Sequence, residues 1–180
     1  MGLKLVTDRT AADAALILTL RGKGWEDFTP DERAYWLRGN PIDLYDAAGA
    51  RLISADGYML QCRDGVIRGA YNFHDLNRVG HAVNYLADLM IGYGYSISVA
   101  SKTDWVVEDV PRVEQMTHYL DCVSTLKEAF YGSTPLPADM DDLTVEDANN
   151  IEKLLLEIET NINHMIASFF YCGEICAGEV

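Results

Sequence analysis

One set of four residues in this sequence could be drawn together as zinc ligands. His118 and Cys122 are spaced i, i+4, so a helix would place them on one face, and Cys172 and Cys176 follow the last predicted helix. Imidazole nitrogens and thiolates are the usual ligands of structural zinc. Nothing in the sequence brings the two pairs together, and the C-x3-C spacing differs from that of a zinc knuckle. We therefore predict no metal site and no cofactor.

Other polar residues offer little for catalysis. Asp139, Asp141 and Asp142 precede a predicted helix, and their charges favour its positive N-terminal end more readily than they perform acid–base chemistry. The histidines lie on predicted helices or at their starts, as solvated or core-edge imidazoles do: His74, His81, His118 and His164. The sequence has no glycine-rich phosphate loop, G-x-S-x-G or H-E-x-x-H motif. We predict that the protein is not an enzyme and has no catalytic residue.

The charge and hydropathy of the chain argue against two classes of partner. Its 180 residues include 28 acidic and 14 basic side chains, a net charge of -14, and the basic ones are scattered. Such a chain would repel a phosphate backbone, so we expect no nucleic-acid partner. No stretch reaches the roughly 18 apolar residues of a membrane span, and residues 1–6 lack the apolar core of a secretory signal. We expect no membrane partner and a protein that stays inside the cell or leaves by lysis.

The elements that would position these residues begin with a helical hairpin over residues 1–40. Thr10 caps a first helix that ends at Arg21. Thr29 and Glu32 form a capping box for a second helix that ends at Gly39.

Residues 41–68 predict a small β-meander inserted after the hairpin. Glycines recur every eight residues at Gly49, Gly57 and Gly65, and the Asp-Gly pairs at the last two are hairpin turn signals. Short runs of strand-forming residues flank these turns. Because so few short strands are marginally stable alone, the insert either packs against the helices to stabilise them or forms a contact surface.

Residues 69–180 predict an antiparallel bundle of three longer helices with an extended C-terminal arm, so the expected fold class is mainly α. The helices are expected over about 72–91, 111–131 and 144–169. Apolar residues recur along each at steps of three and four. They are Leu76, Val79, Val83, Leu86 and Met90; Val113, Met116, Leu120, Val123, Leu126 and Phe130; and Ile151, Leu154, Leu155, Ile158, Ile162, Met165, Ile166 and Phe169. Residues 95–99 alternate at period two and predict a strand.

The last residues of the chain are apolar for a terminal segment. Phe169, Phe170 and Tyr171 precede two Gly-Glu steps, with Ile175 between them. A disordered end is seldom so apolar. The segment is therefore either an arm that docks on a neighbouring subunit or a strand that folds back on its own bundle.

Several motifs of residues 69–180 occur together in one known family. They are Gly69-Ala70-Tyr71-Asn72, Asp75-Leu76-Asn77-Arg78-Val79, Gly94-Tyr95, Lys102-Thr103-Asp104-Trp105, Leu143-Thr144 with Glu146, Ala148-Asn149-Asn150-Ile151-Glu152, and the aromatic Gly-Glu tail. This combination resembles small proteins and C-terminal domains encoded with the tail genes of phages and prophages of Gram-positive gut bacteria. Two features depart from that pattern: residues 41–68 intervene before the first motif, and Cys172 and Cys176 replace the usual Ser and Tyr.

The resemblance implies a virion or tail-associated structural protein, made in the host cytoplasm and acting in assembly or in baseplate or fibre attachment. Its partners would be other tail proteins and copies of itself, and the family supplies no known active site. Large aromatic and apolar side chains usually dominate interface energy, so we expect contacts at Trp105, Tyr71, Tyr58, Phe169, Phe170, Tyr171 and Ile175. The alternative is a small cytosolic phage protein that binds and inhibits a host factor.

Overall fold

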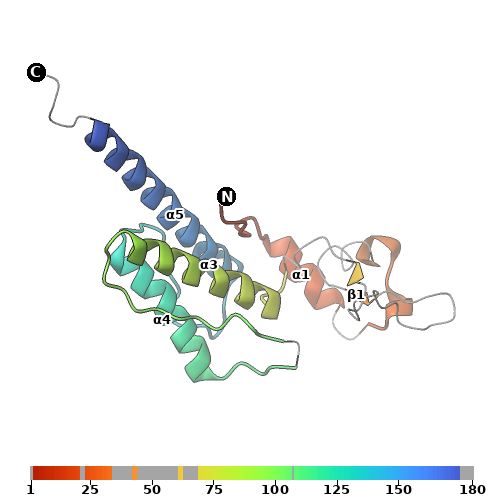
Figure 1. The fold of residues 1–180 in the computed structure, drawn as a ribbon. Helices are drawn as coiled ribbons and strands as arrows, with labels where there is room; N and C mark the ends of the chain where they lie inside the picture. Colours follow the sequence, from red (N-terminus) through yellow and green to blue (C-terminus); the bar gives the residue numbers. More distant parts are fainter. Residues whose placement is uncertain are drawn as a thin grey trace, which may run out of the picture. The chain divides into compact units, whose positions relative to one another are not determined.

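Helices make up most of the part of the chain that the structure describes. The computed structural model describes residues 2–20, 23–33, 42–43, 61–62, 69–106 and 108–174 (Figure 1). The chain divides into two compact units, one formed by Met1–Thr7 with Asn72–Val180 and the other by Asp8–Tyr71. The predicted mainly α fold class is confirmed for the described residues.

In the Asp8–Tyr71 unit, both predicted helix starts are confirmed. α1 (Ala11–Leu20) begins after Thr10, whose backbone N–H donates to the Asp13 carboxylate at 2.8 Å. The second start has the same geometry: the Thr29 N–H donates to Glu32 at 2.8 Å, and residues 30–33 are helical. A short 3-10 turn, η1 (Trp25–Asp27), lies between them in the chain. The expected end of the second helix at Gly39 lies outside the described residues.

Two short strands of this unit pair with each other. β1 (Ile42–Asp43) and β2 (Gln61–Cys62) are antiparallel, with Ile42 opposite Cys62 and Asp43 opposite Gln61. The glycines of the expected turns, at positions 49, 57 and 65, fall outside the described residues. The complete β-meander over residues 41–68 therefore stays a prediction.

The other unit is built around α3 (Phe73–Gly92), α4 (Val113–Ala129) and α5 (Val145–Glu174), each of which contacts the other two. α3 begins where the sequence predicts because the Asn72 side chain accepts the His74 N–H at 2.8 Å. α5 begins after Thr144, whose N–H donates to Asp147 at 3.1 Å. Most residues of the predicted apolar faces are buried, and the innermost are Val79, Val83, Leu86, Val123, Leu126, Ile151, Leu154, Leu155, Ile158 and Ile162.

The three helices run parallel, so the predicted antiparallel arrangement is wrong. Near the N-terminal ends of α3 and α5, Arg78 bonds to Glu152 at 2.6 Å. Just beyond the C-terminal end of α3, the Tyr95 hydroxyl donates to the sulfur of Met165, far along α5, at 3.4 Å. The Tyr95 ring also lies 5.5 Å from that of Phe130, at the C-terminal end of α4. All three helices therefore point the same way (Figure 1).

Long connections explain this arrangement. Short loops join antiparallel neighbours, whereas residues 93–112 and 130–144 return along the bundle before the next helix begins (Figure 1). Residues 95–99 show the predicted alternation, since positions 95, 97 and 99 are half-buried and 96 and 98 are exposed. In the described chain no strand pairs with them, so the predicted strand is wrong. They form an extended segment that lies against helices.

Two predicted helix boundaries also differ from the structure. α4 begins at Val113 and not at Pro111, and Val113 is 73% exposed although its spacing predicted an inner position. Val113 opens the helix, ahead of the turns that reach α3 and α5. α5 continues to Glu174, past the expected end at Phe169, because no glycine or proline interrupts residues 145–172. The first residues of the predicted C-terminal arm, 169–174, are therefore helical.

A buried ion cluster joins the N-terminal halves of α3 and α5. The Arg78 guanidinium donates to the two carboxylate oxygens of Glu152, at 2.9 and 2.6 Å, and also to Asp75. Both carboxylates are 0% exposed. Burial disfavours the charged guanidinium, but the hydrogen bond and charge of Glu152, followed by those of Asp75, outweigh it and raise the pKa of Arg78. Arg78 therefore remains charged between the helices.

Replacing Arg78 with methionine should lower the free energy of unfolding by about 3–5 kcal/mol, because two buried carboxylates lose their ion pair with the Arg78 guanidinium. Urea unfolding followed by circular dichroism measures the loss. Arg112→Met changes an exposed arginine of the same unit and should alter stability by less than about 0.5 kcal/mol. Equal stability of the two variants would show that the cluster does not join the helices.

Another carboxylate, that of Glu157, holds the connection between α4 and α5. Glu157 accepts hydrogen bonds from the N–H and hydroxyl of Ser133, at 2.8 and 2.6 Å, and from those of Thr134, at 3.0 and 2.8 Å. Burial alone would raise the pKa of Glu157, but these bonds outweigh it and lower the pKa to about 2. The connection therefore depends on an ionised carboxylate.

The pKa of Glu157 predicts a pH-dependent contribution to stability. It is lowered in the folded state from 4.5 to about 2, so the stabilisation is complete above the higher value and is lost as pH falls through the lower one. At pH 7 we expect Glu157→Gln to lower the free energy of unfolding by about 1–2 kcal/mol, less than the pKa shift implies because the side chain is partly exposed.

Urea unfolding of the wild-type protein and Glu157→Gln across this pH range is the measurement. The difference between them should shrink as pH falls from 4.5 toward 2. Glu128→Gln, at an exposed position on α4, controls for the general effect of removing a negative charge. A difference that does not change with pH would contradict the role given to the carboxylate.

Candidate binding pocket

Two asparagines of α3 hold the returning segment, residues 95–106, by its backbone. The Asn77 side chain accepts the Trp105 N–H and donates to the Trp105 carbonyl, both at 2.8 Å. Asn84 does the same for Ser101, at 2.8 and 2.9 Å. Each side-chain amide thus replaces the peptide group that a neighbouring strand would offer. This explains how an extended segment is held against a helix.

Gly80 lies between these asparagines and lets the returning segment approach α3. A Cβ at this position would lie 2.4 Å from the carbonyl oxygen of Lys102, closer than non-bonded atoms allow. The spacing of Asn77, Gly80 and Asn84 is i, i+3, i+7, which places all three on one face of the helix. This face of α3 therefore allows a backbone segment to pack closely against the helix.

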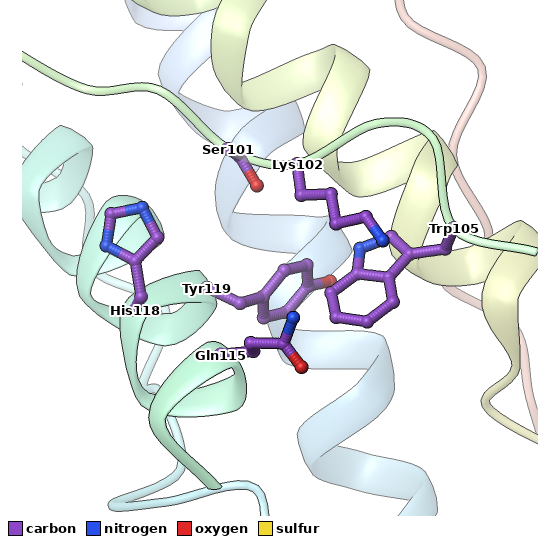
Figure 2. A pocket seen from close by; sticks show the side chains of 6 residues that line it. All are labelled: Ser101, Lys102, Trp105, Gln115, His118 and Tyr119. Atoms are coloured by element: carbon purple, nitrogen blue, oxygen red, sulfur yellow. The ribbon is translucent and has the colours of Figure 1, made fainter. Parts of the chain in front are cut away.

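A pocket of about 230 Å³ lies between the returning segment and α4 (Figure 2). Its lining residues are Ser101, Lys102 and Trp105 of the segment and Gln115, His118 and Tyr119 of α4. Three of them form a buried floor: Ser101 is 7% exposed, Trp105 3% and Tyr119 2%. Gln115 and His118 are exposed and form the rim. Buried aromatic walls with a few polar groups are typical of ligand pockets.

Lys102 carries a positive charge beside the pocket, and that charge is already paired. Its Nζ lies 2.8 Å from the Asp109 carboxylate and 4.1 Å from the centre of the Trp105 ring. The hydrogen bond from Lys102, with a second from the Val106 N–H, lowers the pKa of Asp109, so this carboxylate is ionised at neutral pH. The ion pair therefore holds the turn after Trp105 beside the pocket.

His118 links α4 to the returning segment. Its Nε2 lies 3.1 Å from the Ala100 carbonyl oxygen and 3.7 Å from the Cys122 sulfur. Burial raises the pKa of Cys122, which favours the thiol over the thiolate that zinc requires. Among the described residues no group of three or more His, Cys, Asp or Glu could hold a metal ion. Cys176 and the side chain of Cys172 lie outside those residues.

Two polar atoms of the pocket floor have no hydrogen-bond partner within the described chain, Ser101 Oγ and Trp105 Nε1. Figure 2 shows both facing the space beside the Tyr119 ring. A buried polar group without a partner costs about 1–3 kcal/mol, and folded proteins leave few of them. The pocket is therefore suited to a ligand that supplies hydrogen-bond acceptors.

The residues predicted at interfaces have different surroundings. Trp105 is part of the pocket floor and is not exposed as an anchor. Tyr71 is half-buried, with the Arg9 guanidinium 5.3 Å from its ring centre. The side chains of the others lie outside the described part of the chain: Tyr58, Phe169, Phe170, Tyr171 and Ile175.

Sequence analysis missed most residues that shape the pocket. Asn and Gly have low helix propensity, so their recurrence on one face of α3, at Asn77, Gly80 and Asn84, was a usable signal of a backbone contact. Ser101 and Tyr119 carry no such signal. They converge only because the returning segment docks on the bundle.

No protein-family model, curated protein or solved structure matches this chain. The resemblance to phage tail proteins therefore stays a hypothesis. In the part of the chain that is described, no helix is long and apolar enough to cross a membrane. Function is accordingly inferred from the geometry of the bundle and its pocket.

Gly80→Ala should lower the free energy of unfolding by about 1–3 kcal/mol, because the added methyl group meets a backbone carbonyl that cannot rotate away. Hydrogen exchange at the Ser101 and Trp105 amides should also accelerate, since their bonds to α3 loosen. Gly92→Ala on the same helix is the matched control, as a Cβ there has nothing within 4 Å. If both variants match the wild-type protein, the close approach at Gly80 is refuted.

Proposed function

We propose that this protein is a non-enzymatic structural subunit of a phage tail or virion, acting through contacts with other tail proteins and with copies of itself. The resemblance described above supports the phage context. The β-meander predicted over residues 41–68 would supply one contact. The observation that carries self-assembly is the length of α5.

α5 continues beyond the helices it packs against. It has 30 residues, against 20 in α3 and 17 in α4. At about 1.5 Å per residue, these helices are roughly 45, 30 and 25 Å long. Because α3 and α5 meet near their N-terminal ends, the excess lies at the C-terminal end of α5 (Figure 1).

The apolar stripe of α5 becomes less buried toward this projecting part. Ile158 and Ile162 are fully buried in the bundle, whereas the next stripe positions, Met165 and Ile166, are only half-buried. The sequence pattern then reaches Phe169. Apolar residues at steps of three and four form the seam when helices associate. A second copy would cover this stripe with its own, as in the symmetric interfaces of most homo-oligomers.

We expect the purified protein to form a discrete oligomer, measured as absolute mass by light scattering coupled to size exclusion. Ile166→Glu should convert it to a monomer, because a charge would be placed in the seam. Asn163→Glu, at an exposed position on the same helix, should leave the mass unchanged. Deleting residues 171–180 should give a folded monomer.

Circular dichroism of each variant separates lost assembly from lost folding. A wild-type monomer whose mass does not change with ionic strength would sink the self-assembly proposal. That result would favour the alternative, a phage protein that binds and inhibits a host factor.

A further inference from the structure

We propose that the pocket between the returning segment and α4 recognises an aromatic side chain together with an adjoining backbone carbonyl of a partner protein. The inference rests on the proposed protein–protein function and names the chemistry of the partner. It concerns a different surface from the self-assembly seam on α5, so the two can fail separately.

The hydrogen-bonding groups of the pocket call for an acceptor. Trp105 Nε1 can only donate, and the Ser101 hydroxyl can donate as well. Neither atom has a partner in the described chain. Gln115 uses its carbonyl oxygen to accept the Arg112 N–H at 2.9 Å, so the group it has left to offer is its amide NH2. A peptide carbonyl, with two lone pairs, meets this excess of donors.

The charges favour a neutral acceptor over a carboxylate or phosphate. Lys102 is engaged by Asp109 at 2.8 Å, and Asp104 lies 3.8 Å from the same ammonium. The chain as a whole has a net charge of -14, which repels anions. An uncharged carbonyl is not repelled by this net negative charge.

The size and walls of the pocket favour one aromatic side chain. About 230 Å³ is below the range of roughly 300–1,000 Å³ typical of sites for drug-sized ligands. Trp105 and Tyr119 provide buried ring surfaces, and aromatic rings gain from edge-to-face or offset contacts with each other.

Exposed valines beside the pocket indicate that the aromatic side chain bound there belongs to a polypeptide. Val106, Val110 and Val113 are 49%, 83% and 73% exposed. They belong to the turn and helix start that follow Trp105, and the bond between Asp109 and Lys102 holds this turn beside the pocket. Such residues would contact the chain on either side of the anchor and exclude water from it. A small molecule confined to the pocket would leave them uncovered.

The test uses the full chain and three probes. N-acetyl-L-phenylalaninamide supplies a ring and amide carbonyls, N-acetylglycinamide lacks the ring, and toluene lacks the carbonyl. The readout is the indole N–H resonance of Trp105 in a proton–nitrogen correlation spectrum, assigned with Trp105→Phe. We expect a saturable downfield shift with the first probe and at least about tenfold weaker binding of the other two.

Two variants test the role of the floor. Ser101→Ala should weaken binding of N-acetyl-L-phenylalaninamide by about three- to tenfold, the effect of one hydrogen bond. Ser98→Ala, exposed on the same segment, should leave it unchanged. The proposal is overturned if the Trp105 resonance does not respond, if toluene binds equally well, or if Ser101→Ala has no effect. The light-scattering mass of the same samples reports self-assembly independently.

Discussion

The bundle depends on hydrogen-bond partners for the backbone of chain segments that lie against helices. Among the residues that the structure describes, no neighbouring strand supplies those partners. A peptide group that loses water needs a hydrogen-bond partner, and the backbone of a neighbouring α-helix has already used its own groups. In this protein the partners are side chains that project from α3 and α5: Asn77, Asn84, Glu152, Glu157 and Glu159. Asn77, Asn84 and Glu157 hold the two connections that return along the bundle between parallel helices. Glu152 and Glu159 hold the N-terminal segment in the same way.

Four of these side chains form two pairs that have the same spacing along their helices. Asn77 and Asn84 on α3, and Glu152 and Glu159 on α5, are each seven residues apart, which is two helical turns or about 10.5 Å. An extended chain covers that distance in three to four residues. The backbone groups they bind are those of Trp105 and Ser101 on α3, and Val6 and Leu3 on α5. Two points of contact fix both the position and the antiparallel direction of each segment.

Interactions between residues close in sequence predicted much of this fold. The rest depends on contacts between residues distant in sequence. The starts of α3 and α5 and the apolar faces of the helices were predicted because both depend on residues close in sequence. The parallel direction could not be predicted, since it depends on long connections held by single polar side chains. The pocket was missed for the same reason, apart from Trp105, because Ser101 and Tyr119 meet only after the returning segment has docked.

Several polar contacts that hold the bundle together join residues distant in sequence. Arg78 and Glu152 are 74 residues apart, and Val6 and Glu152 are 146 apart. Loop closure of this kind costs entropy before any contact repays it, and folding slows as contact order rises. The folding rate of this bundle should therefore be closer to that of a mixed α/β domain than to that of an antiparallel helical bundle. During synthesis, α3 and α4 would lack their contacts with α5 until α5 has left the ribosome.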